Sequence, residues 1–124
     1  GFVEAGDYRL HYALTLARDL PSAIAGSYGI LQRPNLAVLT VAIAPRNAPA
    51  GRAVAGAQVE ATAVSLTGAR EAHALERRDG PGAATWIATV EVRHRVPLTI
   101  EIEALAAPGE PLLRARLTRE FRLQ

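Results

Sequence analysis

Apolar and polar residues alternate with a period of two along this chain, in segments of about ten residues that glycines and prolines separate. One clear segment is 8–17, whose apolar phase is Tyr8, Leu10, Tyr12, Leu14 and Leu16. Such alternation is typical of a strand with one buried face, because successive side chains of a strand point to opposite faces. Alanine is abundant and favours helices, but ten glycines and eight prolines leave few stretches where a long helix could form. The pattern therefore predicts an all-β protein.

Six further segments show the same alternation or a weaker form of it. Segment 98–103 is the cleanest, since its apolar phase lies opposite Thr99, Glu101 and Glu103. About seven short strands with turns at this spacing are typical of an antiparallel sandwich and not of alternating strands and helices. We therefore predict a single immunoglobulin-like β-sandwich domain over residues 1–124. The other predicted strands are 39–43, 59–64, 72–78, 85–92 and 113–123, and the predicted turns include 79–82 and 108–111.

The late strands also predict part of the core. Their apolar phases must face a single interior, because the inner faces of two packed sheets form one core. We therefore expect Trp86 to be buried together with Ile100, Ile102 and Leu117.

One short helix is predicted over residues 22–28, after the first strand. Pro21 suits the first turn of a helix, and Gly29 suits the left-handed residue that often follows the last turn. No other segment has a helical pattern.

The residue types that hold metals and cofactors are scarce. The chain has no cysteine and no methionine, which excludes disulfides, thiolate zinc sites and copper sites built on thioethers. The three histidines, His11, His73 and His94, are far apart in the sequence, whereas the histidine ligands of a metal site are often only a few residues apart. We therefore expect no metal ion and no cofactor.

Catalytic patterns are equally weak. Ser27 directly follows Gly26, and Gly29 lies two residues after it. The nucleophile elbow of hydrolases, however, needs a glycine two residues before the serine, where this chain has Ala25. Glu101 and Glu103 share one face of a predicted strand, opposite its apolar phase, so we expect them to face solvent and not to act as paired acid and base. The sequence therefore predicts a protein that is not an enzyme.

The charge pattern favours neither nucleic acid nor membrane. Fourteen basic residues, all arginine, are scattered among twelve acidic ones, and aromatic residues make up 5% of the chain. Binding of single-stranded nucleic acid usually combines a basic groove with stacking aromatics. No apolar run approaches the roughly 20 residues that a transmembrane helix needs. We expect no nucleic-acid partner and no membrane insertion.

Several short motifs are spread over nearly the whole chain. They are Gly6-Asp7-Tyr8 with His11-Tyr12, Pro21 with Ala25 and Tyr28-Gly29-Ile30, Arg33 before Leu39-Thr40-Val41, then Val59, Leu66, Gly68, Trp86-Ile87-Ala88, and Leu117-Thr118 with Phe121. At these positions the chain resembles the bacterial family named domain of unknown function 4426. It departs from that family at Ala5, Leu20 and Ser65, which affects the predicted helix cap and one turn but not the fold.

The resemblance implies a location but no activity. Members of the family are proteobacterial proteins with a secretion signal, which implies a periplasmic mature chain. Removal of such a signal would explain why the sequence has no methionine at its start. The family has no assigned activity and no functional residues that could be transferred to this chain.

Two hypotheses about function follow. The first is a non-catalytic module that binds or scaffolds another protein, with Tyr28, Ile30 and Arg33 as the candidate interaction surface, because tyrosine and arginine often dominate interface energies. The alternative is a small-molecule domain, enzymatic or not, in which Arg33 lines a pocket for an anionic ligand. For Tyr28 a structural role also stays open, because the segment from Ile24 to Ile30 could instead cap the core.

Overall fold

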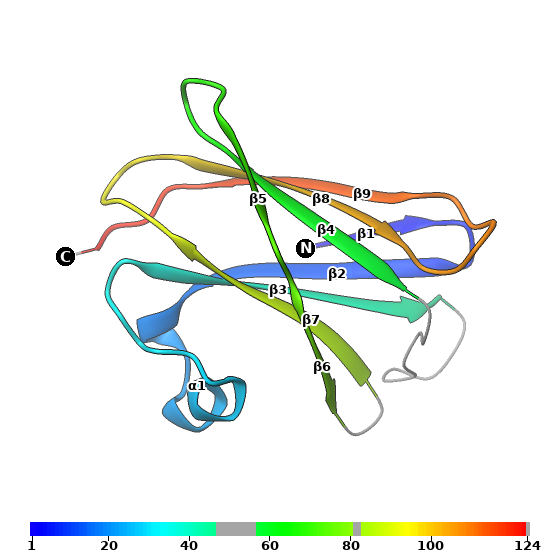
Figure 1. The fold of residues 1–124 in the computed structure, drawn as a ribbon, viewed down its shortest axis with the longest axis horizontal. Coiled ribbons are helices and arrows are strands. Elements are labelled where there is room, and N and C mark those ends of the chain that lie inside the picture. Colours follow the sequence, from blue (N-terminus) through cyan, green and yellow to red (C-terminus); the bar gives the residue numbers. More distant parts are fainter. Residues whose placement is uncertain (47–56, 81–82, 124) are drawn as a thin grey trace.

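The computed structural model describes residues 1–46, 57–80 and 83–123, and it consists of two antiparallel β-sheets packed face to face (Figure 1). The first sheet has the order β1 (Phe2–Ala5), β2 (Tyr8–Leu16), β3 (Leu36–Pro45), β7 (Ala83–Glu91) and β6 (Glu76–Gly80). The second has the order β5 (Arg70–His73), β4 (Gln58–Val64), β8 (Leu98–Leu105) and β9 (Leu113–Arg119).

This order is that of an immunoglobulin-like sandwich. In the standard strand lettering of the immunoglobulin fold, one sheet has the order ABED and the other CFG. The first sheet here matches ABED with β2, β3, β7 and β6, and the second matches CFG with β4, β8 and β9. The remaining strands, β1 and β5, each extend one edge of a sheet. The predicted fold class is therefore confirmed, with two short edge strands added to the seven.

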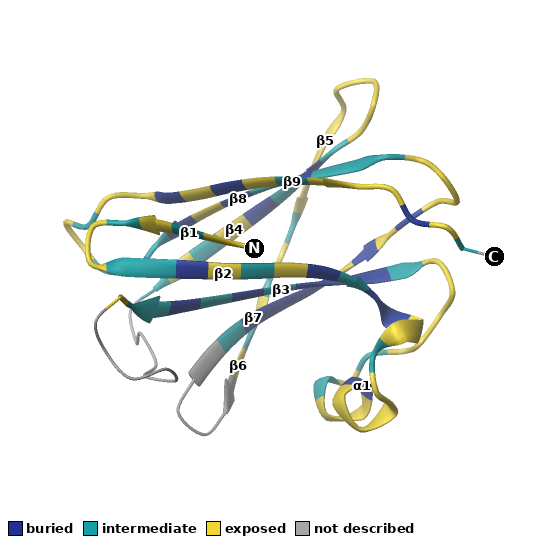
Figure 2. Ribbon diagram, turned by 180° about the vertical axis from the view of Figure 1, so that it is seen from behind, coloured by how far each residue is buried: buried dark blue, intermediate teal, exposed yellow. Residues whose placement is uncertain are grey.

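The core lies between the inner faces of the sheets, and buried and exposed residues alternate along strands such as β8 and β9 (Figure 2). Trp86 is 5% exposed, Ile100 1% and Ile102 0%, and the half-buried Leu117 packs against the same cluster. The predicted core is therefore confirmed, and it fixes which face of each late strand points inward.

The connection between β2 and β3 holds the helical part of the chain. A 3₁₀ turn, η1 (Ala17–Asp19), precedes helix α1 (Ser22–Tyr28), and Gly29 ends the helix with a left-handed φ of 69°. The predicted helix and its end are thus confirmed. At seven residues α1 is short, and nowhere in the described chain is a helix long and apolar enough to cross a membrane.

Helix α1 lies against the outer face of the first sheet. Ala17, Val38 and Ile87 form a small buried cluster there, separate from the main core, and Tyr28 and Ile30 pack against it. Val38 and Ile87 occupy the outward phase of β3 and β7, because their sequence neighbours Leu39 and Trp86 belong to the main core. The helical segment therefore covers one corner of an outer sheet face.

The predicted strand 72–78 is wrong as a single element. The chain forms β5 in the second sheet up to His73, passes through Ala74 and Leu75, and forms β6 in the first sheet from Glu76. A period of two continues through such a change of sheet, so local alternation does not reveal it. The turn predicted at 79–82 lies partly outside the described residues, and Asp79 and Gly80 end β6.

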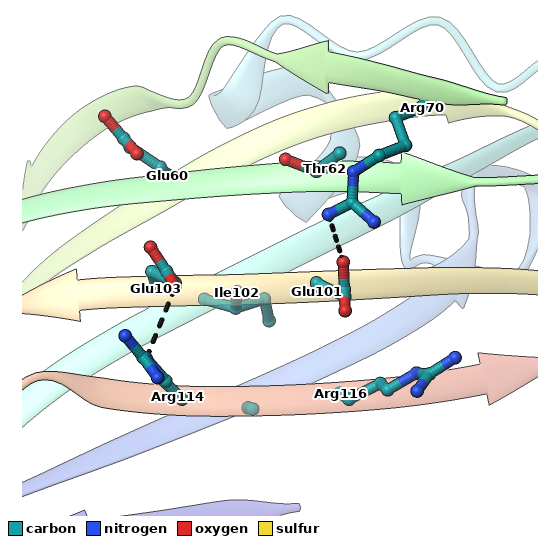
Figure 3. A pocket seen from close by; sticks show the side chains of 9 residues that line it. Glu60, Thr62, Arg70, Glu101, Ile102, Glu103, Arg114 and Arg116 are labelled. Carbon is teal, nitrogen blue, oxygen red and sulfur yellow. Dashed lines mark hydrogen bonds and ion pairs between the residues drawn. The ribbon is translucent and has the colours of Figure 1, made fainter. Parts of the chain in front are cut away.

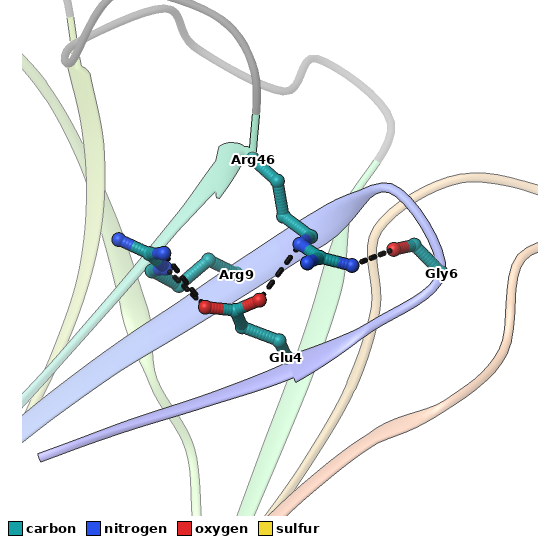
Figure 4. Close-up of polar contacts among 4 residues, drawn as sticks. All are labelled: Glu4, Gly6, Arg9 and Arg46. Carbon is teal, nitrogen blue, oxygen red and sulfur yellow. Dashed lines mark hydrogen bonds and ion pairs between the residues drawn. The ribbon is translucent and has the colours of Figure 1, made fainter.

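Strand β1, which the alternation did not predict, is joined to the end of β3 by a charged cluster (Figure 4). The carboxylate of Glu4 accepts hydrogen bonds from Arg9 at 3.0 and 2.6 Å and forms an ion pair with Arg46 at 2.7 Å. Arg46 also donates to the carbonyl oxygen of Gly6 over 3.2 Å. The β1–β2 turn is thus held against β3.

Candidate functional site

The predicted surface residues Tyr28, Ile30 and Arg33 differ in their exposure and in the features that they border. Tyr28 and Ile30 are half-buried against the cluster under α1, whereas Arg33 is exposed on the loop that leads into β3. Tyr28 also borders a shallow hollow on the outer face of the first sheet, and Arg33 borders a different one. Of the three, Arg33 has the side chain most open to a partner.

Replacing Tyr28 with alanine is expected to lower the free energy of unfolding by about 1–2 kcal/mol. The substitution removes a partly buried aromatic ring that packs against the cluster containing Val38 and Ile87. Denaturant titration followed by circular dichroism measures this loss. Ser27→Ala is the matched control on the same helix, since within the described chain the exposed Ser27 hydroxyl bonds only to the Ile24 carbonyl at 2.9 Å, and it should change stability by less than about 0.5 kcal/mol. Full stability of Tyr28→Ala with loss of partner binding would make Tyr28 a recognition residue instead.

Strand β6 covers only the first part of β7, and this leaves an opening at the edge of the first sheet. The first residue of β6, Glu76, pairs with Ile87, so residues 88–91 of β7 pair only with β3 within the described chain. The chain that would have continued β6 upstream lies in β5, in the other sheet (Figure 1). The change of sheet between β5 and β6 therefore exposes part of the β7 edge.

The pairing of β7 with β3 shows which backbone groups this edge presents. Val92 donates its N–H to the carbonyl of Asn35 over 2.9 Å, and the pairing continues from there without a break in register. Because hydrogen-bonded and non-bonded pairs alternate in an antiparallel ladder, Val90 directs its N–H and C=O to β3, while Thr89 and Glu91 direct theirs to the open side. No described residue forms a backbone hydrogen bond with Thr89 or Glu91 on that side.

A hollow of about 670 Å³, here named the edge slot, lies along this open edge. Its lining includes the inward-facing Val90 and the outward-facing Thr89 and Glu91, so it wraps around the edge of β7 instead of lying on one sheet face. Four of its apolar lining residues, Leu36, Ala63, Val90 and Leu98, are buried or half-buried, whereas most of its charged and polar lining residues are exposed. The full lining is Arg33, Leu36, Ala63, Ser65, Ala69, Arg70, Glu71, His73, Thr89, Val90, Glu91 and Leu98.

Three charged side chains of the edge slot have no partner in the described part of the chain. Arg33, Glu71 and Glu91 form no ion pair and no side-chain hydrogen bond there. Arg70 differs, because its guanidinium is bonded to Glu101. Among the described residues, the slot therefore presents one cation and two carboxylates that have no ion pair.

A second hollow of about 420 Å³, here named the loop hollow, adjoins the edge slot. The two share Ser65, Glu71, Glu91 and Leu98 in their linings. The loop hollow adds Val96, Pro97 and Leu66, of which Leu66 is 74% exposed and Val96 42%. Slot and hollow together form a continuous concave surface with exposed apolar residues at its outer end.

The residue types of a hydrolase triad meet in the edge slot, but their contacts do not suit catalysis. Ser65, His73 and Glu71 all line it. The Ser65 hydroxyl shares a hydrogen bond of 2.9 Å with the Thr67 hydroxyl and accepts the Ala69 N–H at 3.1 Å, so it is held within its own turn. A nucleophilic serine must instead bond to its base, and no such bond joins Ser65 to His73 in the structure described.

The histidines lie at three separate places. His11 is exposed on β2 with its ring centroid 5.8 Å from that of Phe2, His73 lines the edge slot, and His94 accepts the Leu123 N–H at Nδ1 over 3.0 Å. Across the three described stretches, no group of three metal-ligating side chains comes together.

The outer face of the second sheet contains a hollow of about 390 Å³ that is lined mainly by charged side chains (Figure 3). Glu101 is bonded to Arg70, and Glu103 forms an ion pair with Arg114 at 3.3 Å. Both carboxylates point away from the core, as predicted, and each has a guanidinium beside it. Such exposed pairs contribute little energy individually, and the arrangement is that of a solvated sheet face.

The edge slot was not predicted, because it depends on where β6 begins and on which β7 groups face β3. Arg33 was predicted as a site residue, but Thr89, Glu91 and Glu71 were not. A weak signal was present, since Glu71 and His73 occupy the same phase as Ala61 and Ala63 of the paired strand β4. Polar residues in an inward phase indicate that β5 extends beyond the core.

Comparison with known proteins identifies the family. A comparison with curated proteins gives no significant match. Among solved structures, the chain is similar to a DUF4426 family protein from Pseudomonas aeruginosa PAO1, with a TM-score of 0.76 and 23% identity over 98% of this chain and 94% of that one. It is also similar to FetP of uropathogenic E. coli strain F11, with a TM-score of 0.57 and 9% identity over 97% and 93% of the two chains. At these identities both likenesses support the fold alone.

The family assignment rests on the sequence. The chain matches the model of the family described as "Domain of unknown function (DUF4426)" over residues 2–122. This match covers nearly every residue, and the protein therefore belongs to the DUF4426 family.

Proposed function

We propose that the protein is a non-catalytic periplasmic module that binds another protein through the edge slot and the loop hollow. The observation that carries this proposal is the continuity of the two hollows, which share four residues and combine buried or half-buried apolar residues with charged side chains that have no ion pair among the described residues. Protein interfaces usually have an apolar centre and a polar rim. The exposed side chains of Leu66 and Val96 extend the apolar area beyond the slot.

A periplasmic location is consistent with the family resemblance and with one structural neighbour. The FetP structure is of protein expressed recombinantly in the periplasm of E. coli. The absence of cysteine leaves the redox compartment open, so the location is part of the proposal.

A second candidate function is the binding of an anionic small molecule, with Arg33 as its counter-ion. Its support is that Arg33 has no ion pair with any described residue and borders a hollow of adequate size. The carboxylates of Glu71 and Glu91 line the same hollow and would repel an anion. This distribution favours a protein partner, whose side chains can match both signs of charge.

The test uses charge and polarity changes at the rim. Proteins captured by the immobilised chain from periplasmic extract are identified by mass spectrometry, and the affinity of the captured protein is measured for each variant. Leu66→Asp and Arg33→Glu are expected to weaken it about tenfold or more, because the first places a charge at an apolar contact and the second places a negative charge beside the negative partner group that Arg33 would pair with.

The matched control for Leu66→Asp is Leu112→Asp. Leu112 is 46% exposed and lies before β9, beside Gln58 at the far end of β4 from Leu66. This variant should bind as the wild type does. Equal affinity of all three variants and the wild type would contradict the proposed site, and saturable binding of a small anion that Arg33→Glu abolishes would support the second candidate.

A further inference from the structure

We propose that the edge slot takes up an extended segment of the partner, which adds as a strand beside residues 88–91 of β7, antiparallel to it and in line with β6. This inference rests on the proposed function and names the kind of partner segment that the site fits. Addition of a strand to an open sheet edge is a recurring mode of peptide recognition, in which the backbone supplies affinity and side-chain pockets supply specificity.

The backbone of β7 supplies the first argument. Thr89 and Glu91 direct two N–H and two C=O groups to the open side, where no described residue accepts or donates to them. The neighbouring residue of the same edge, Ile87, is paired with Glu76 of β6. An added segment would therefore extend a ladder that the chain itself begins and leaves unfinished.

The shape of the slot supplies the second argument. A hollow that touches Val90 on the inner face of the sheet and Thr89 on the outer face occupies the space that a neighbouring strand would fill. On the inner side, a residue of the segment opposite Val90 would meet Ala63 and Leu98. Val90 and Ala63 are 3% and 8% exposed, so this position suits a small or branched apolar side chain.

The unpaired charges supply the third argument. The residue of the segment opposite Glu91 would have its side chain on the same outer face as that carboxylate, because directly opposed residues of a ladder share a face. Glu71 borders the slot from β5 at the same end, since both carboxylates also border the loop hollow. A basic side chain therefore fits opposite Glu91, and the segment should have the pattern basic, apolar, polar in chain order.

The probe is the synthetic peptide acetyl-Thr-Lys-Val-Thr-Val-amide, which ends opposite Ala88 because Glu76 already pairs with Ile87, and it is added at millimolar concentration to the ¹⁵N-labelled full chain. Its lysine would face Glu91, its first valine Val90 and its second threonine Thr89. We expect the amide resonances of Thr89 and Glu91 to shift on titration and their hydrogen exchange to slow. Absence of these changes, or changes centred elsewhere, would overturn strand addition at this edge.

Backbone methylation of the peptide gives a matched pair of controls. N-methyl groups on the lysine and the second threonine block the N–H groups that would face β7, and this peptide should bind about tenfold more weakly or not at all. N-methyl groups on the two valines block N–H groups that face away, and this peptide should keep most of its affinity. Equal weakening by both modifications would contradict the proposed pairing.

The same test is made on the protein with Thr89→Pro and Thr89→Ala. Proline removes an N–H that faces the open edge and leaves the hydrogen bonds to β3 intact, a position at which a strand tolerates it. We expect Thr89→Pro to lose the peptide and Thr89→Ala to retain it. If Thr89→Pro fails to fold, the methylated peptides still decide the question.

Two outcomes separate this inference from the proposed function. If the partner captured by the wild type is lost in Leu66→Asp but retained by Thr89→Pro, the binding site stands and strand addition is wrong. If the free chain is a dimer in which the Thr89 and Glu91 amides are already protected, a second copy occupies the edge, and the proposed partner segment is overturned.

Discussion

Replacement of Trp86 by alanine is expected to lower the free energy of unfolding by about 3–5 kcal/mol. The side chain is 5% exposed and lies in the main core, and the guanidinium of Arg77 on the paired strand lies 5.1 Å from its ring centroid. Truncation would leave a cavity between Val41 of β3 and the facing sheet, in addition to the lost transfer energy. A domain of this size has only about 5–15 kcal/mol of stability in total, so the variant should lose a large part of it.

Chemical denaturation followed by circular dichroism measures this effect. Fluorescence is unsuitable, because Trp86 is the only tryptophan of the chain. Thr85→Ala is the control, since its side chain lies on the outer face of the same strand and should change the midpoint little. An unchanged midpoint in Trp86→Ala would place the tryptophan outside the core and shift the register of β7 by one residue.

The strands of the central fold were predictable from the sequence, because one buried face imposes a period of two. Segments 8–17 and 98–103 became β2 and β8 with the expected residues inside. The change of sheet between β5 and β6 was not predictable in this way. Alternation specifies which side chains share a face, but it does not specify which of two sheets a strand joins.

The candidate site was predictable only in part, for a related reason. Arg33 could be proposed from residue type and position, and it does border the edge slot. Tyr28 and Ile30 were proposed on the same grounds, yet they pack under α1 against Val38. The exposed backbone of Thr89 is a property of pairing between distant segments, and no local pattern in the sequence encodes it.

The β1–β2 turn is the other position where a single change should have a large effect. Gly6 has a left-handed φ of 56°, and a Cβ added to it would lie 2.7 Å from Glu110 Oε2 and 3.0 Å from Pro111 Cδ. The glutamate side chain could swing away, but the proline ring is part of the loop before β9. Substitution at Gly6 therefore combines backbone strain with a steric conflict between the two sheets.

Gly6→Val is expected to cost about 1–3 kcal/mol from backbone strain and about 1–3 kcal/mol more from the contact with Pro111. Gly29→Val is the matched control, because Gly29 has a similar φ of 69° but, apart from its chain neighbours, no described residue has an atom within 4 Å of the added Cβ, and it should show the strain alone. Urea denaturation of both variants measures the difference. Gly6→Val should also loosen the contact between Arg46 and the Gly6 carbonyl, so hydrogen exchange should rise in β1 but not in β8. Equal losses in the two variants would mean that the loop before β9 yields freely and that the β1–β2 turn does not hold the two sheets together at this end.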